Sequence, residues 1–110
     1  MDKKELVANF SQELRRGTVV LCVLASLKEP TYGYSLIEEL SGVPIEANTL
    51  YPLLRRLEGQ GLLASVWNTE GVKPRKYYSL TPFGREVLGE LKQRWQSAVQ
   101  SMAKILEGSD

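Results

Sequence analysis

Residues 46–62, Glu-Ala-Asn-Thr-Leu-Tyr-Pro-Leu-Leu-Arg-Arg-Leu-Glu-Gly-Gln-Gly-Leu, decide the fold of this chain. Their apolar residues recur three and four positions apart, which predicts a helix from about Ala47 to Gln60 with one face in a core. The core face carries Leu50, Leu53, Leu54 and Leu57. Gly61 follows as the predicted stop, because glycine adopts the left-handed conformation that ends many helices.

The opposite face of this helix carries groups that suit a DNA groove. It presents Asn48, Tyr51, Pro52 and Arg55, with Thr49 and Arg56 on its flanks. Asparagine can pair with an adenine edge and arginine with a guanine edge, while threonine and tyrosine can reach phosphates. Any solvent-exposed helix face carries polar groups of this kind, so the face alone leaves DNA binding and ordinary solvation open.

Pro52 is unusual for its position several residues inside the predicted helix. A proline there lacks one backbone hydrogen bond and costs about 3 kcal/mol. Either the helix begins later than Ala47, or the strain is tolerated for the shape that it produces. The proline ring also offers an apolar surface that can meet a thymine methyl group.

The residues after Gly61 change to a strand pattern. Leu63–Asn68 and Arg75–Leu80 are rich in aromatic and branched residues and enclose a turn-rich segment, so they predict a β-hairpin. The predicted tip carries Lys73, Arg75 and Lys76. Cations at a tip can straddle the phosphates beside a groove. The alternative is a charged loop that keeps a sheet edge soluble.

The upstream residues predict further helices. Residues 3–14 are amphipathic, and residues 18–27 are nearly all apolar. For the second segment we expect a buried helix, because of its length and its continuity with the charged residues before it. Tyr32-Gly33-Tyr34 then leads into a short helix for which Gly42 is the predicted stop. A Val43-Pro44-Ile45 link completes the pair of helices.

The last segment predicts a long helix for association. Thr81 suits its cap and Pro82 its first position, and no strong breaker follows before Gly108. Apolar residues alternate three and four apart, as in a coiled-coil seam; they are Leu88, Leu91, Trp95, Ala98, Met102 and Ile105. A chain of 110 residues has little core to cover such a stripe, so we expect a homodimer. Leu6 and Phe10 of the first helix would pack across the paired helices.

Trp95, in the middle of this seam, has two interpretations. It fills the dimer core, or two symmetry-related rings enclose a flat apolar or cationic ligand. Gly84 and Gly89 each weaken the helix by about 1 kcal/mol relative to alanine. This would allow helix shifts that change the spacing between the two wings.

Charge and composition restrict the function further. The net charge is +1, but residues 47–76 carry five Lys or Arg and two acidic residues. Local positive charge suits a polyanion. The chain has no histidine and one cysteine, Cys22, which we expect to be a small core residue. A histidine-based catalytic pair and a histidine-rich or thiolate-rich metal site are therefore excluded, and we expect no enzyme, no metal and no cofactor.

The order of helix, helix, helix, hairpin and long helix describes a winged helix-turn-helix, mainly α with a small β-hairpin. We expect one compact unit, in which residues 1–81 form the N-terminal helix and winged helix-turn-helix, and residues 82–110 the dimerisation helix. No apolar run approaches the roughly 20 residues that span a bilayer. Residues 1–5 lack the apolar region of a signal peptide, so we expect a cytoplasmic protein.

The sequence resembles the PadR-like transcriptional regulators, in the short branch with a single C-terminal helix. The matching segments are Tyr32-Gly33-Tyr34, residues 48–62, and residues 75–84, Arg-Lys-Tyr-Tyr-Ser-Leu-Thr-Pro-Phe-Gly. The resemblance implies a homodimeric regulator, usually a repressor, that binds an inverted-repeat operator in double-stranded DNA. It also implies an effector at the dimer centre, because several relatives of this size respond to aromatic or cationic compounds.

The resemblance also bears on single residues. It implies that residues 49–52 lie at the DNA surface, with Tyr51 contacting a phosphate, and we include Tyr34 in the same predicted DNA-binding set. Many family members carry glycine where this chain has Asn48, so Asn48 is the candidate for individual sequence preference. The alternative function is a winged-helix module that binds another protein instead of DNA, and it predicts a monomer or a heterodimer.

Overall fold

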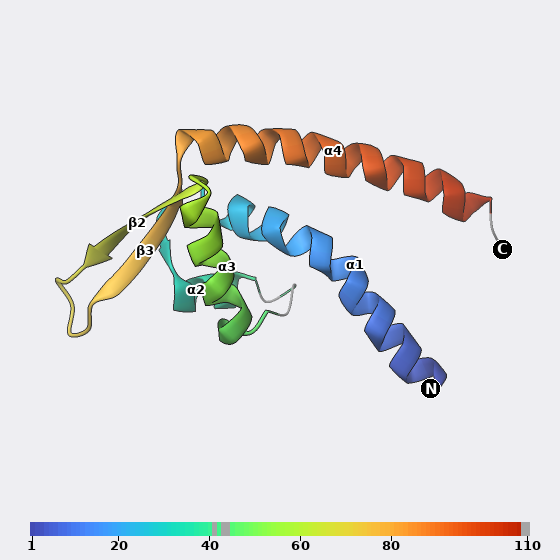
Figure 1. Ribbon diagram of the computed structural model, residues 1–110, viewed down its shortest axis with the longest axis horizontal. Helices are drawn as coiled ribbons and strands as arrows, with labels where there is room; N and C mark the ends of the chain where they lie inside the picture. The colour runs from blue at the N-terminus through green and yellow to red at the C-terminus, as the bar shows by residue number, and fades with distance from the viewer. Residues whose placement is uncertain (41, 43–44, 109–110) are drawn as a thin grey trace.

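A computed structural model describes residues 1–40, 42 and 45–108 of the chain. Four helices and three short strands follow one another in these residues (Figure 1). Their bounds are Lys3–Ser26 for α1, Thr31–Tyr32 for β1, Gly33–Glu39 for α2, Ala47–Gly59 for α3, Leu63–Asn68 for β2, Arg75–Leu80 for β3 and Pro82–Glu107 for α4. This is the predicted winged helix-turn-helix fold, mainly helical with a small antiparallel sheet.

Helix α1 is a single helix of 24 residues. The Asp2 side chain caps it and accepts a hydrogen bond from the Glu5 N–H at 2.8 Å. Its C-terminal half enters the core through Val23 and Leu24, which confirms the buried helix predicted for residues 18–27. Its N-terminal half extends away from the body of the molecule (Figure 1).

Helix α2 starts near the predicted Tyr-Gly-Tyr segment but is shorter than predicted. It ends at Glu39 with Leu40 as its cap, so Gly42 does not end it. The Leu40 side chain is buried, and its N–H donates to the Leu36 carbonyl at 3.0 Å. The helix therefore ends at this buried leucine, before the glycine is reached. Val43 and Pro44 of the predicted link lie outside the described residues.

Helix α3 begins at Ala47, so Pro52 lies inside it. The Leu50 N–H already donates to the Glu46 carbonyl at 2.9 Å, a helical bond two residues before the proline. Of the two alternatives for Pro52, a later helix start is wrong. Gly61 has a φ of 81° and confirms the predicted left-handed stop.

The hairpin of β2 and β3 has the predicted bounds, with Leu63 opposite Leu80 and Asn68 opposite Arg75. The sequence did not predict the two-residue strand β1, which pairs with the other edge of β3 and gives the order β1-β3-β2. Two residues are too short to show an alternating pattern. The extra strand ties the start of α2 to the wing formed by β2 and β3.

The core lies where α1, α2, α3, the base of the hairpin and the start of α4 meet. Its buried side chains are Val23, Leu24, Leu27, Leu36, Leu40, Leu50, Leu54, Leu57, Leu62, Leu63, Tyr78, Leu80 and Leu88. Three of the four leucines predicted for the core face of α3 are therefore fully enclosed. The fourth, Leu53, packs at the margin together with Cys22 and Leu91.

Helix α4 starts as predicted, because the Thr81 hydroxyl accepts a hydrogen bond from the Gly84 N–H at 2.9 Å. Gly84 is needed for packing: a Cβ at this position would overlap the Leu62 carbonyl oxygen. This glycine thus lets α4 approach the end of α3 closely, a role that the sequence did not indicate. Beyond this point α4 diverges from α1 (Figure 1).

Candidate nucleic-acid interface

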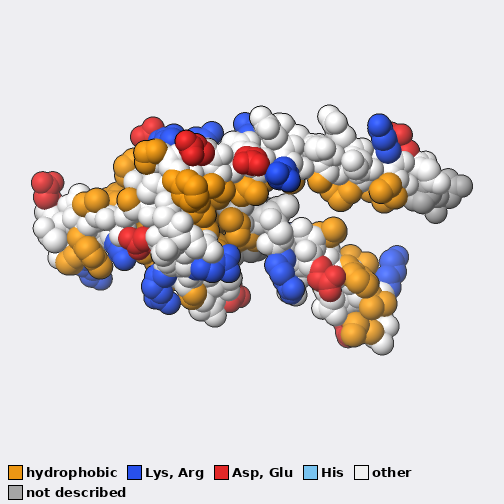
Figure 2. All heavy atoms as spheres, turned by 45° about the horizontal axis from the view of Figure 1, so that its top comes forward, with side chains coloured by type: hydrophobic (Ala, Val, Ile, Leu, Met, Phe, Trp, Pro, Cys, Tyr) orange, Lys and Arg blue, Asp and Glu red, His pale blue; other side chains and the backbone are white. Residues whose placement is uncertain are grey.

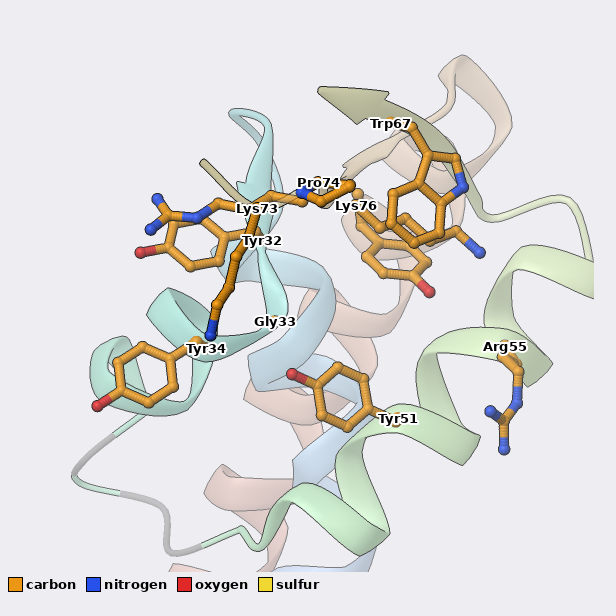
Figure 3. A pocket seen from close by; sticks show the side chains of 11 residues that line it. Tyr32, Gly33, Tyr34, Tyr51, Arg55, Trp67, Lys73, Pro74 and Lys76 are labelled. Carbon is orange, nitrogen blue, oxygen red and sulfur yellow. The ribbon is translucent and has the colours of Figure 1, made fainter. Parts of the chain in front are cut away.

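A groove of about 680 Å³ lies between the wing, the start of α2 and the middle of α3 (Figure 3). Its lining is aromatic and cationic. It consists of Tyr32, Gly33, Tyr34, Tyr51, Arg55, Trp67, Lys73, Pro74, Arg75, Lys76 and Tyr78. Six of the predicted DNA-binding residues thus meet at one surface, although they come from three separate parts of the chain. Such a surface offers both cations and hydrogen-bond donors to a phosphate backbone.

The side chain of Tyr51 is held in this groove by the backbone of α2. A Cβ on Gly33 would lie only 2.5 Å from Cε1 of the Tyr51 ring, so the ring fits only over a glycine. Figure 3 shows the ring pointing from α3 toward the start of α2, while Arg55 extends from a later position in the same helix. The two sequence motifs around Gly33 and Tyr51 therefore form one contact.

The remaining predicted residues of α3 lie elsewhere on its surface. Thr49, Pro52 and Arg56 line a second hollow of about 470 Å³ between α3 and α1, beside Arg16. Asn48 is exposed in the first turn of the helix and borders neither hollow. The helix therefore presents its DNA candidates over a broad face and not in a single cluster.

The three cations of the wing have different surroundings. Lys73 is exposed in the connection between the strands. The Arg75 guanidinium lies 4.5 Å from the centre of the Tyr32 ring, in cation–π geometry. The Lys76 side chain contacts α3 and not the tip of the wing, because its Nζ lies 3.7 Å from Oε1 of Glu58. The cluster predicted for the tip is therefore divided among the tip, β1 and α3.

Three residues that line this groove, Trp67, Gly33 and Tyr32, are absent from the DNA-binding set predicted from the sequence. Trp67 is 61% exposed and lines the groove from β2, opposite Lys76 in the strand register. Strand alternation places Trp67 on the same face as the buried Leu63, so the sequence pattern gave no signal that this indole ring is exposed. No signal marks Gly33 either, whose role depends on Tyr51 across the fold.

The predicted dimer residues fall into two groups. Leu88 is buried in the core of the chain itself, and Leu91 packs against that core. The others are exposed: Leu6, Phe10, Trp95, Ala98, Met102 and Ile105. Figure 2 shows hydrophobic side chains along the projecting parts of both α1 and α4. Trp95 also borders an apolar hollow of about 430 Å³ between these helices, together with Cys22, Lys28 and Lys92.

The described residues offer little for other kinds of site. Among residues 1–40, 42 and 45–108, no three His, Cys, Asp or Glu side chains are grouped closely enough to bind a metal ion. In the same residues, every helix is too short or too polar to cross a lipid bilayer. The aromatic and cationic groove is accordingly the best-supported candidate site.

Comparison with known proteins identifies the family. The model of the transcriptional regulator PadR-like family matches residues 20–90, which include α2, α3 and the wing. The chain belongs to the PadR-like family. It is therefore a DNA-binding transcriptional regulator and not an enzyme. The resemblance to the PadR-like family that the sequence showed is confirmed.

Individual transcriptional regulators match this chain over most of their length. The crystal structure of a PadR family regulator from Eggerthella lenta has 53% sequence identity and a TM-score of 0.90, covering 94% of this chain and 95% of that one. The transcriptional regulator Rv3488 of Mycobacterium tuberculosis is 38% identical, covering 88% of this chain and 90% of its own. A PadR-like regulator from Bacillus cereus has 28% identity and a TM-score of 0.79, covering 88% and 99%.

Proposed function

We propose that this PadR-like regulator is a homodimeric repressor that binds an inverted-repeat operator. The observation that carries the proposal is the groove beside α3, where Tyr34, Tyr51, Arg55 and Lys73 are brought together. In a winged helix-turn-helix, the second helix of the motif enters the major groove. Here that helix is α3, and the wing would follow the neighbouring phosphates.

The side chains of α3 divide the work of recognition in this proposal. Asn48 and Arg55 reach base edges, because an amide suits adenine and a guanidinium suits guanine. Tyr51 contacts a phosphate, in the orientation that Gly33 imposes on its ring. Thr49 and Arg56 contact the DNA backbone from the side of α3 that faces α1. Pro52 lies on the same side of the helix and contacts a thymine methyl group.

The wing and α2 supply further phosphate contacts. Lys73 lies in the exposed connection between β2 and β3, where its ammonium group can follow the backbone. Arg75 is stacked on Tyr32 and directs its charge to the same surface. Tyr34, at the start of α2, borders the groove from the opposite side (Figure 3).

The dimer would form through the exposed apolar residues of α1 and α4. Pairing of α4 with its copy covers Trp95, Ala98, Met102 and Ile105, and the N-terminal half of α1 packs across through Leu6 and Phe10. Two recognition helices then lie about 34–36 Å apart, one turn of DNA. Occupancy of the operator by this dimer would exclude polymerase. Because its target is DNA, we place the protein in the cytoplasm.

The hollow beside Trp95 suggests how release from the operator is controlled. Its apolar wall and indole ring suit a flat aromatic effector, bound where the two chains meet. Lys28 and Lys92 border the same hollow and disfavour a cationic ligand, since like charges repel. In a Trp67→Phe protein, we expect neutral or anionic aromatic compounds to quench Trp95 more strongly than cationic ones.

Selection of bound fragments from random DNA tests the proposed function. We expect a palindromic consensus, together with a dimer in sizing chromatography. Arg55→Ala should weaken binding by roughly 1–3 kcal/mol, with the loss concentrated at one base position of each half-site. A monomer that enriches no DNA sequence would instead support the winged-helix module that binds another protein.

A further inference from the structure

Glu58 of α3 contacts both strands of the wing. One carboxylate oxygen, Oε2, accepts a hydrogen bond from the Ser65 hydroxyl of β2. The other, Oε1, lies 3.7 Å from the Lys76 ammonium group of β3. A single side chain near the end of the recognition helix thus contacts both strands of the wing, in addition to the pairing of β3 with β1.

The surroundings of Lys76 favour this contact over one with solvent. Its side chain is 31% exposed and that of Glu58 is 33% exposed, so both charges are partly shielded from water. The Lys76 ammonium group also lies 5.2 Å from the centre of the Tyr78 ring. A carboxylate and an aromatic ring together attract this cation toward α3 and away from the tip of the wing.

The charge of Glu58 is otherwise unfavourable on this face. Residues 47–76 form the cationic part of the chain, and Glu58 is one of only two acidic residues in it. An anion beside a DNA groove repels phosphate, so charge alone would favour a neutral residue at this position. Its two contacts with the wing offer a reason for a carboxylate here.

We propose that Glu58 is a positioning residue that sets the orientation of the wing relative to α3, and that Lys76 acts through it instead of binding a phosphate. This inference rests on DNA binding by the face that carries α3 and the wing. The helix and the wing must contact the duplex at the same time. A wing that is already held at the correct angle does not have to be ordered when DNA binds, so the free-energy cost of ordering it does not weaken the affinity.

The first test measures operator affinity and its salt dependence. Glu58→Gln removes the charge but can still accept the Ser65 hydrogen bond, and Lys76→Met removes the ammonium group at similar length. We expect each single variant to reduce operator affinity by about threefold to tenfold. The double variant should lose no more affinity than the more strongly affected single variant, because both substitutions remove the same interaction. Lys76→Met should leave the salt slope unchanged.

Lys73→Met is the matched control, because Lys73 lies on the same wing without the Glu58 contact. It should reduce the magnitude of the salt slope by about 1, as loss of one phosphate contact does. The proposal is overturned if Lys76→Met reduces the slope in the same way. It is also overturned if Glu58→Gln tightens binding, because Glu58 would then only compete with DNA for Lys76.

The second test needs no DNA. Hydrogen exchange of the β2 and β3 amides should be faster in Glu58→Gln and Lys76→Met, with the thermal midpoint nearly unchanged. Ser65→Ala removes only the hydrogen bond to Glu58 and leaves both charges in place. It should also speed the exchange of the β2 amides. Unchanged exchange in all three variants would refute the positioning role. Absence of DNA binding in the unaltered protein would refute the proposed function instead, and exchange would still decide the role of Glu58.

Discussion

At the scale of single residues, the contact between Gly33 and Tyr51 joins two parts of the sequence into one binding surface. Gly33→Ala would place a methyl group 2.5 Å from the present position of the Tyr51 ring. Because this ring is 40% exposed, it can rotate outward, so we expect a loss of only about 1 kcal/mol in folding stability. The phosphate contact proposed for Tyr51 would then be lost, and we expect operator affinity to fall about tenfold.

A double variant separates displacement of the ring from damage to the fold. In Gly33→Ala with Tyr51→Ala, no ring remains to collide with the methyl group. The double variant should therefore bind DNA no more weakly than Tyr51→Ala alone, as measured by fluorescence anisotropy. Additive losses in affinity would mean that Gly33 acts independently of Tyr51.

Gly84 differs from Gly33 because the atom in its way is backbone. The Leu62 carbonyl oxygen cannot rotate aside, so Gly84→Ala must push α4 away from the end of α3. We expect a loss of about 2–4 kcal/mol in the free energy of unfolding, measured by urea denaturation.

Gly89→Ala is the matched control in the same helix, because its added Cβ has no atom within 4 Å apart from its chain neighbours and the backbone of α4 around it. Alanine has the higher helix propensity, so this variant should gain up to about 1 kcal/mol. Equal stability of the Gly84 and Gly89 variants would contradict the role assigned to the close approach of α4.

Single-residue roles were the part of the site that the sequence predicted least completely. The polar face of α3 follows from helical period alone, and the structure brings Tyr51 and Arg55 to the groove as part of that face. Gly33, Glu58 and Gly84 depend on contacts with residues distant in the chain, which periodicity does not report. The same applies to Lys76, whose nearest carboxylate belongs to a different element.

At the scale of elements, the wing and α3 form opposite sides of the groove. Trp67 lies on the wing side, and Arg55 lies on the α3 side (Figure 3). An operator bound in the proposed manner would reach the exposed indole ring and change its environment. In a Trp95→Phe protein, we expect binding of operator DNA to quench Trp67 emission, and Trp67→Phe to weaken binding severalfold.

The salt dependence of this signal serves as its internal check. Quenching and affinity should decline together as salt rises, because both depend on contact with phosphates. Quenching by DNA of unrelated sequence should need higher concentrations. Trp67 emission that stays constant while anisotropy reports a full complex would show that the wing lies away from the duplex.

Elements were predicted well where a regular pattern was long enough to be recognised. The hairpin and α3 follow from strand and helix periods, and Thr81 with Pro82 gives the start of α4. Strand β1 was missed because two residues hold no pattern, and α2 ends at Glu39, before the predicted Gly42. Strand β1 is defined by its pairing with the distant β3, which local sequence does not report.

At the scale of the whole molecule, the chain has two projecting helical segments with uncovered apolar side chains. Ile105 of the predicted seam is 71% exposed, and Phe10 of α1, which was predicted to pack across that seam, is 60% exposed. Exposed apolar residues in such continuity fit the association surface proposed for the dimer. The sequence predicted the seam, but it could not show that Leu88 belongs to the core of the chain, because one apolar stripe can serve both purposes.

Disruption of this surface should separate the two chains without unfolding either. Phe10→Asp and Ile105→Asp each place a charge where the proposed dimer has an apolar contact, and both positions are outside the core of one chain. We expect a monomer in sizing chromatography with helical circular dichroism largely retained. Operator affinity should fall about a hundredfold or more, because each chain then binds one half-site without the other.

Gln100→Asp places the same charge on the exposed face of α4 away from the seam, and it should leave both the mass of the dimer and its operator affinity unchanged. If the two seam variants remain dimeric, the chains must associate through some other surface, and the spacing proposed for the two recognition helices would be wrong.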